Sequence, residues 1–154
     1  MVQLRDKRLP PGERASLARR VVEVSHRHGA RVLVNGDETF ARALGADGVH
    51  WPADRLMCAT ARPAGLLCAA SCHSLQELER AAELDCDLAV VGPVLDTASH
   101  PGADTLGWDG FARLTLGARL PIFAIGGVQP ADLERAWTCG GHGLAMIRGS
   151  WNLN

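Results

Sequence analysis

Two glycines stand directly after a short apolar run near the end of the chain. Residues 120–125 are almost entirely apolar and lead into Gly126 and Gly127, a pattern typical of a buried parallel strand and its exit. Glycines at the carboxyl tip of a strand let backbone N–H groups approach an anion, because no Cβ stands in the way. In (β/α)₈ barrels the loops after the last two strands commonly bind phosphate. The alternative is a glycine-rich strand-to-helix turn without a ligand.

Polar side chains alternate along the first apolar run. Gln3, Arg5 and Lys7 are two residues apart, so all three can point to one side of a strand and its exit. Arginine offers a fork of donors and lysine a point charge, and together with an amide they suit a pyrophosphate. A solvated strand end is the alternative.

Two histidines and a polar loop follow later apolar runs. His50 and His73 each stand at the end of such a run, and histidine exchanges protons near neutral pH. A lone histidine at a strand end is more often only hydrogen-bonded, so a catalytic role stays open. The loop between residues 92 and 107 presents Thr97, Ser99 and His100, which either meet an anionic substrate or serve the turn itself.

Alternation of apolar and amphipathic stretches predicts the elements that position these residues. Seven strands are expected, at Val2–Arg5, Arg31–Asn35, Gly48–Trp51, Leu66–Cys72, Leu88–Val94, Pro121–Ile125 and Leu144–Ile147. Helical patterns lie between them, and such alternation implies parallel strands joined by right-handed crossovers.

The helix signals are local. Pro11 opens a pattern in which Leu17, Val21, Val24 and His28 recur at helical spacing. Asp37 is placed to cap a short helix, and residues 74–77 form a capping box.

Composition narrows the possibilities further. With 154 residues, of which 47% are hydrophobic, one packed core is expected. A net charge of −1 gives no electrostatic reason to expect nucleic acid or a membrane surface as partner. No apolar run approaches the roughly 20 residues of a membrane span. Five cysteines without metal-type spacing predict free thiols in a reducing, cytoplasmic protein.

Six motifs follow one another in a specific order along the chain. They are Gln-Leu-Arg-Asp-Lys at 3–7, Val-Asn at 34–35, Gly-Ala-Asp-Gly-Val-His at 45–50, Ser-Cys-His-Ser at 71–74, Gly-Pro-Val-x-x-Thr at 92–97 and Ala-Ile-Gly-Gly at 124–127. In this order they resemble the thiamine-phosphate synthase and thiazole tautomerase superfamily.

The resemblance implies a (β/α)₈ TIM barrel and two candidate reactions. The synthase joins a pyrimidine pyrophosphate to a thiazole phosphate and releases pyrophosphate, with Mg²⁺ present. The tautomerase isomerises the thiazole phosphate without a metal. The match begins at the family's second strand, so we expect one N-terminally incomplete domain over residues 1–154, with seven strands and no first strand.

The resemblance also assigns roles to residues. Catalytic roles fall on His73, which matches the proton-transfer histidine of the tautomerase, and on Arg5, Lys7 and His100, which would stabilise departing pyrophosphate. The substrate-binding set is Gln3, Arg5, Lys7, Asn35, Ser71, Thr97, Ser99, Gly126 and Gly127.

The metal position departs from the family pattern. Gly36 stands where the family has a magnesium-binding aspartate, with Asp37 one place late, and Asp54 follows His50 by four residues where the family has five. Mg²⁺ demands near-ideal octahedral oxygen geometry, so Asp37 and Asp54 are expected to form a weak site at best. His100 replaces the lysine of the family's loop.

Three interpretations stay open. The first is a synthase-like domain that binds both phosphorylated ligands, with weakened or lost Mg²⁺-dependent transfer. The second is a metal-independent tautomerase using His73. The third is a non-enzymatic phosphate-ligand-binding domain of a larger Nudix-hydrolase fusion, since the loop Ser-His-Pro-Gly-Ala and the ending Gly-Ser-Trp resemble a branch found behind Nudix domains. Seven strands also leave two unpaired edges, so a homodimer is a further expectation.

Overall fold

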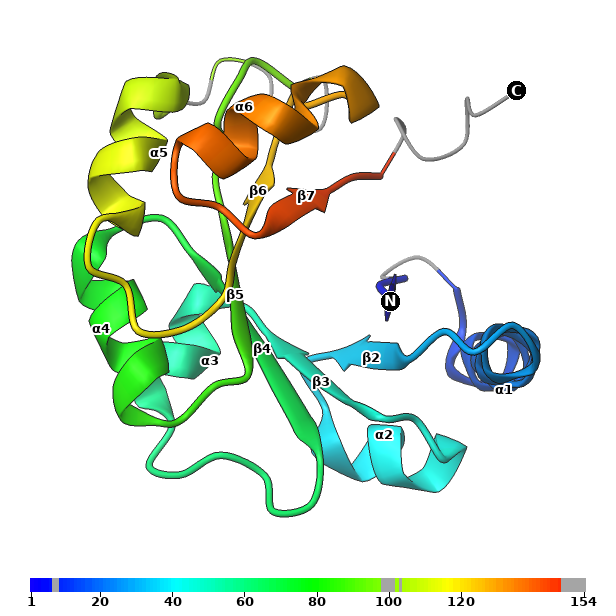
Figure 1. Ribbon diagram of the computed structural model, residues 1–154. Helices are drawn as coiled ribbons and strands as arrows, with labels where there is room; N and C mark the ends of the chain where they lie inside the picture. Colours follow the sequence, from blue (N-terminus) through cyan, green and yellow to red (C-terminus); the bar gives the residue numbers. More distant parts are fainter. Residues whose placement is uncertain (7–8, 98–101, 103, 148–154) are drawn as a thin grey trace.

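Seven parallel strands form one curled sheet in the order in which they occur along the chain (Figure 1). The computed structural model describes residues 1–6, 9–97, 102 and 104–147. Each strand pairs in parallel with the next. The strands are β1 (Val2–Leu4), β2 (Val32–Asn35), β3 (Gly48–Trp51), β4 (Leu67–Cys72), β5 (Leu88–Val91), β6 (Ile122–Ile125) and β7 (Gly143–Ala145). All seven predicted strands are therefore present, and the fold is of the TIM-barrel type with one strand lacking.

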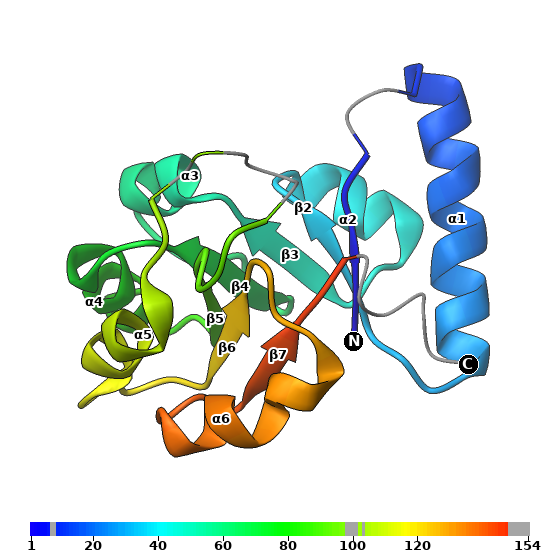
Figure 2. The same ribbon diagram turned by 90° about the horizontal axis from the view of Figure 1, so that it is seen from above.

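Helices cover the outer, convex face of the curled sheet (Figure 2). They are α1 (Pro11–Arg27), α2 (Glu38–Leu44), α3 (Ala53–Cys58), α4 (Leu75–Glu83), α5 (Gly107–Thr115) and α6 (Leu133–Thr138), with a short 3₁₀ turn at Pro130–Asp132. The predicted cap at Asp37 is confirmed, and so is the serine half of the predicted capping box at residues 74–77. Asp37 accepts hydrogen bonds from the N–H groups of Thr39 and Phe40, and Ser74 accepts one from Glu77.

Strand alternation divides the side chains between two faces. Residues such as Val34, Val49, Cys68 and Ala124 point outward and form the core beneath the helices. The residues between them point into the hollow of the sheet. The predicted polar side chains at the strand ends belong to this inner set.

The apolar repeat of α1 is helical but does not mark its buried face. Ala18 and Val22 are buried, whereas Leu17 and Val24 are 38% and 45% exposed. The buried face of α1 is therefore formed by Ala18 and Val22, and not by Leu17, the larger residue just before Ala18. The small Ala18 lets the helix lie close to the sheet, which size-based pattern reading misses.

The sheet has two edges. In the part of the chain that the structure describes, β1 pairs with β2 alone and β7 with β6 alone. None of the helices is both long and apolar enough to traverse a lipid bilayer, as far as the described residues go.

Candidate functional site

Four polar side chains from neighbouring strands form an arc at the carboxyl ends of β1 to β4. This polar arc consists of Gln3, Asn35, His50 and Ser71. The Gln3 amide donates to Oδ1 of Asn35 at 3.3 Å, and Nε2 of His50 lies 2.8 Å from Oγ of Ser71. Parallel register places each member beside or two residues beyond its neighbour, because Gln3 pairs with Leu33, Asn35 with His50, and His50 with Ala69.

His50 is the most enclosed member of the polar arc. It is 5% exposed, and burial, together with the positive charge of Arg5, lowers the pKa of His50 to about 4. The imidazole is therefore neutral at pH 7. A neutral ring bonded to the Ser71 hydroxyl can orient that hydroxyl toward a ligand without adding charge.

Sequence reasoning left a catalytic role open for His50 and did not include it among the predicted site residues. The signal lies in the register, since His50 pairs with Asn35 on one side and with Ala69, two residues before Ser71, on the other. A histidine on the inner face between two such residues belongs to the same cluster.

The second group of predicted residues lies at the ends of β5 and β6. Gly126 and Gly127 have positive φ angles of 94° and 69°. A Cβ on Gly126 would lie 2.6 Å from Cβ of Pro93, and one on Gly127 would lie 2.4 Å from the carbonyl oxygen of Asp96. The Leu95 N–H donates to the Gly126 carbonyl at 3.0 Å. Glycine is required twice at this turn, for its conformation and for the close approach of the 93–96 segment.

This contact brings two predicted phosphate-binding elements together. The glycine turn at 126–127 lies against the loop that leads to Thr97, which is half-buried. Lys7, Ser99 and His100, the remaining predicted members of the site, lie outside the residues that the structure describes.

His73 stands between the two groups, just past the end of β4. Its Nδ1 lies 2.5 Å from the carbonyl oxygen of Gly92 at the end of β5. A carbonyl only accepts, so Nδ1 carries the proton and Nε2 is the acceptor nitrogen. The side chain is exposed, so Nε2 is open to a proton on a bound molecule. Glu77 accepts the backbone N–H of His73 and fixes its position.

The two predicted metal ligands are occupied in other ways. Oδ1 of Asp37 caps α2 through two backbone N–H groups, and Oδ1 of Asp54 accepts the N–H of Arg55 at 2.8 Å. Over residues 1–6, 9–97 and 104–147, no three histidine, cysteine or acidic side chains are grouped to hold a metal ion. Mg²⁺ prefers several oxygen ligands at fixed angles, and the described donor set does not fit it.

Comparisons with known proteins agree on one family. The family model described as thiamine monophosphate synthase matches residues 1–149. The thiamine-phosphate synthase of Methanoculleus marisnigri is 35% identical over 151 residues, which cover 96% of this chain and 72% of that protein. The thiamine-phosphate synthase of Gloeobacter violaceus is 34% identical over 151 residues, 96% of this chain but 44% of its own length.

The fold has a counterpart among solved structures. The thiamine phosphate pyrophosphorylase from Pyrococcus furiosus superposes with a TM-score of 0.76 at 23% identity, over 94% of this chain and 70% of that one. This likeness concerns the fold, and the chain spans less than half of the Gloeobacter relative.

Proposed function

The chain belongs to the thiamine monophosphate synthase family, and from this premise we propose that it binds a thiazole phosphate and a pyrimidine pyrophosphate at the carboxyl ends of its strands. It is a thiamine-phosphate-synthase-like domain of thiamine biosynthesis. We further propose that its Mg²⁺-dependent transfer is weak or lost.

The polar arc carries the binding proposal. It presents two amides, a neutral imidazole and a hydroxyl on four adjacent strands, which suits the ring nitrogens and amino group of a pyrimidine. The charge of Arg5 acts on His50, so a guanidinium lies near the arc to meet a pyrophosphate bidentately. The glycine turn at 126–127 offers an approach without side chains to the thiazole phosphate.

The metal donor set supports weak transfer. Departing pyrophosphate carries charge that Mg²⁺ neutralises when it is bound, and the Asp37 carboxylate serves as a helix cap instead. Arg5 and, from the family pattern, Lys7 and His100 are left to stabilise the leaving group electrostatically.

Binding and turnover are measured separately. Isothermal titration with each phosphorylated ligand, with and without Mg²⁺, is expected to show binding that Mg²⁺ changes little. Steady-state assays with both ligands are expected to show little turnover at millimolar Mg²⁺. Robust turnover that saturates with Mg²⁺ would refute the weak-transfer proposal, and absence of binding in a folded preparation would refute the site.

His73 favours a second candidate, a metal-independent tautomerase. Its Nδ1 is anchored on Gly92 and the residue is exposed, an arrangement that suits a general acid/base. Isomerisation of the thiazole phosphate in the absence of metal, followed by NMR in D₂O, is expected to fall at least 100-fold in His73→Gln. A variant at exposed His142 provides the control.

Binding without either reaction would support the third interpretation, a phosphate-ligand-binding domain. In that case a second copy of the chain or a Nudix-type domain is the proposed partner.

A further inference from the structure

Two buried thiols face one another at the amino ends of β4 and β5. Cys68 is the second residue of β4, and Cys86 lies two residues before β5. Their sulfur atoms are 3.8 Å apart, and the residues are 0% and 6% exposed. The proposed function uses neither residue.

The backbone on both sides of the pair is held by short hydrogen bonds. The Cys68 N–H donates to the Asp87 carboxylate at 2.7 Å, and the Asp87 N–H donates to the Cys68 carbonyl at 2.8 Å. The Cys86 N–H donates to the carbonyl oxygen of Ala81 at 2.9 Å. The sulfurs must approach from 3.8 Å to about 2.05 Å to form a bond.

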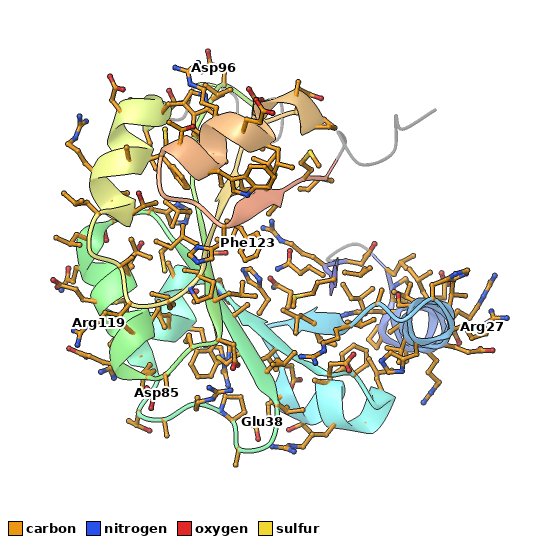
Figure 3. All side chains as sticks on the ribbon, in the orientation of Figure 1. Arg27, Glu38, Asp85, Asp96, Arg119 and Phe123 are labelled. Atoms are coloured by element: carbon orange, nitrogen blue, oxygen red, sulfur yellow. The ribbon has the colours of Figure 1, made fainter. Side chains whose placement is uncertain are left out.

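A cavity gives solvent a route to the wall beside the pair. It holds about 770 Å³ and opens at the amino ends of the strands, and its lining includes Leu67 and Asp85, the chain neighbours of the two cysteines. Figure 3 places Asp85 and Asp96 at opposite ends of the molecule, so this cavity is remote from the loop beside the glycine turn. The cysteines themselves do not line this cavity, so an oxidant in it reaches the thiols only through a local opening of the wall.

The surroundings distinguish the two thiols. The hydrogen bond between the two thiols lowers the pKa of Cys86, with help from the Arg62 charge and against the effects of burial and of the Asp87 and Asp85 carboxylates. The same hydrogen bond and burial raise the pKa of Cys68. Arg62 is fixed near the pair by its 2.6 Å contact with the Asp87 carboxylate. Cys86 is therefore the thiol that ionises first and attacks an oxidant.

We propose that Cys68 and Cys86 are a redox-active pair that a small hydroperoxide converts to an intramolecular disulfide. The Cys86 thiolate attacks the peroxide O–O bond and keeps one oxygen as a sulfenic acid, while the other oxygen leaves protonated as water or alcohol. The Cys68 sulfur then attacks the Cys86 sulfur, so that an S–S bond forms, the S–O bond breaks and water leaves. Two thiols lose two electrons, and the peroxide gains them.

Peptide mapping of the full chain tests this pairing directly. The reduced protein is treated with hydrogen peroxide, its remaining thiols are alkylated, and its peptides are analysed by mass spectrometry. Two of the five cysteines should be lost from alkylation, joined as a 68–86 disulfide that dithiothreitol reverses. Retention of both thiols while exposed Cys58 is oxidised would overturn the proposal, as would a disulfide that uses Cys72 or Cys139.

Variants and an unfolded control separate this geometry from general thiol reactivity. Cys72→Ser, at a buried thiol on the same face of β4, should leave the 68–86 disulfide intact. Cys86→Ser should protect Cys68 from oxidation, and Cys68→Ser should leave a Cys86 sulfenic acid that dimedone traps. The wild-type chain in urea should lose the preference for 68–86. Equal preference for that pair in urea would show that the fold does not create it.

Discussion

β4 and β1 both contribute to the polar arc, but they hold their side chains differently. β4 lies between β3 and β5, and its Ser71 bonds to His50, which is 5% exposed. β1 pairs with β2, and no second partner occurs within the described ranges. Gln3 on β1 and Arg5 just after it are exposed. An edge strand leaves a row of backbone groups unpaired, so the β3–β4 half of the site is preorganised, whereas the β1 half depends on whatever occupies the edge.

The largest expected effect compares glycines on an inner strand and on an edge strand. A Cβ on Gly48 of β3 would lie 2.2 Å from the Leu67 carbonyl oxygen, which belongs to the sheet backbone. A Cβ on Gly143 of β7 would meet the ring edge of Phe123 at 3.0 Å, and a ring can shift. Gly48→Ala is expected to lower the free energy of unfolding by about 3 kcal/mol, and Gly143→Ala by less than about 1 kcal/mol. Urea denaturation measures both, and equal losses would show that the edge is as rigid as the interior.

The second effect is a pH dependence of stability that comes from the β3–β4 half of the site. The pKa of His50 falls from 6.5 to about 4 in the folded chain, so below pH 6.5 the unfolded chain binds more protons than the folded one. Stability should therefore decrease as the pH falls from about 6.5 toward 4, by up to about 3 kcal/mol. His50→Gln should remove most of that slope. Denaturation at pH 7 and 4.5 provides the measurement, with His28→Gln at an exposed residue as the control. An unchanged slope in His50→Gln would assign it to other groups.

The strands and the inward-facing residues of the β3–β4 half of the site were the part that sequence could predict. Strand positions followed from apolar runs bounded by Gly and Pro, and the seven predicted strands appear with ends shifted by a few residues. Asn35 and Ser71 fall on the inner face because strand parity depends only on local alternation. The role of His50 stayed open because it depends on the register between strands, which one strand's sequence does not contain.

The glycine turn at 126–127 and helix α1 show which contacts a sequence pattern does not predict. Gly126 and Gly127 suggested an anion site, but the contacts with Pro93 and Asp96 add a packing requirement that only the fold reveals. On α1, the aliphatic repeat predicted a helix but not its buried face, since Ala18 lies toward the sheet and Leu17 is 38% exposed. Local sequence thus predicts elements better than it predicts what packs against them.

The third effect concerns self-association through the open edges. The outer edges of β1 and β7 have no strand partner among the described residues, and exposed apolar residues such as Val2, at 38%, favour pairing with another copy. We expect the 154-residue chain to dimerise, and Val2→Lys to weaken the dimer about tenfold, since lysine protects edges. Leu75→Lys, on α4 where Leu75 is 53% exposed, is the control. Sedimentation showing a stable monomer, with β1 and β7 amides as protected from exchange as those of β4, would contradict this expectation.

The smallest expected effect lies where α1 meets the sheet. Burial alone would raise the pKa of Asp47, but hydrogen bonds from the Val32 N–H and from His26, each 2.8 Å long, lower it below 3.8. A carboxyl group whose pKa is lower in the folded chain stabilises the fold at pH values above its unfolded-state pKa. That stabilisation is lost as the pH falls through the folded-state pKa. Asp47→Asn keeps an acceptor oxygen but loses the charge, so we expect a loss of about 0.5–1 kcal/mol at pH 6. As the pH falls through the lowered pKa of Asp47, the variant and the wild type should converge, because the wild-type carboxyl becomes protonated. Glu83→Gln removes the charge from an exposed ion pair with Arg80 on α4 and should lower the free energy of unfolding less. An equal loss there would mean that the His26–Asp47 contact stabilises the fold no more than a surface ion pair.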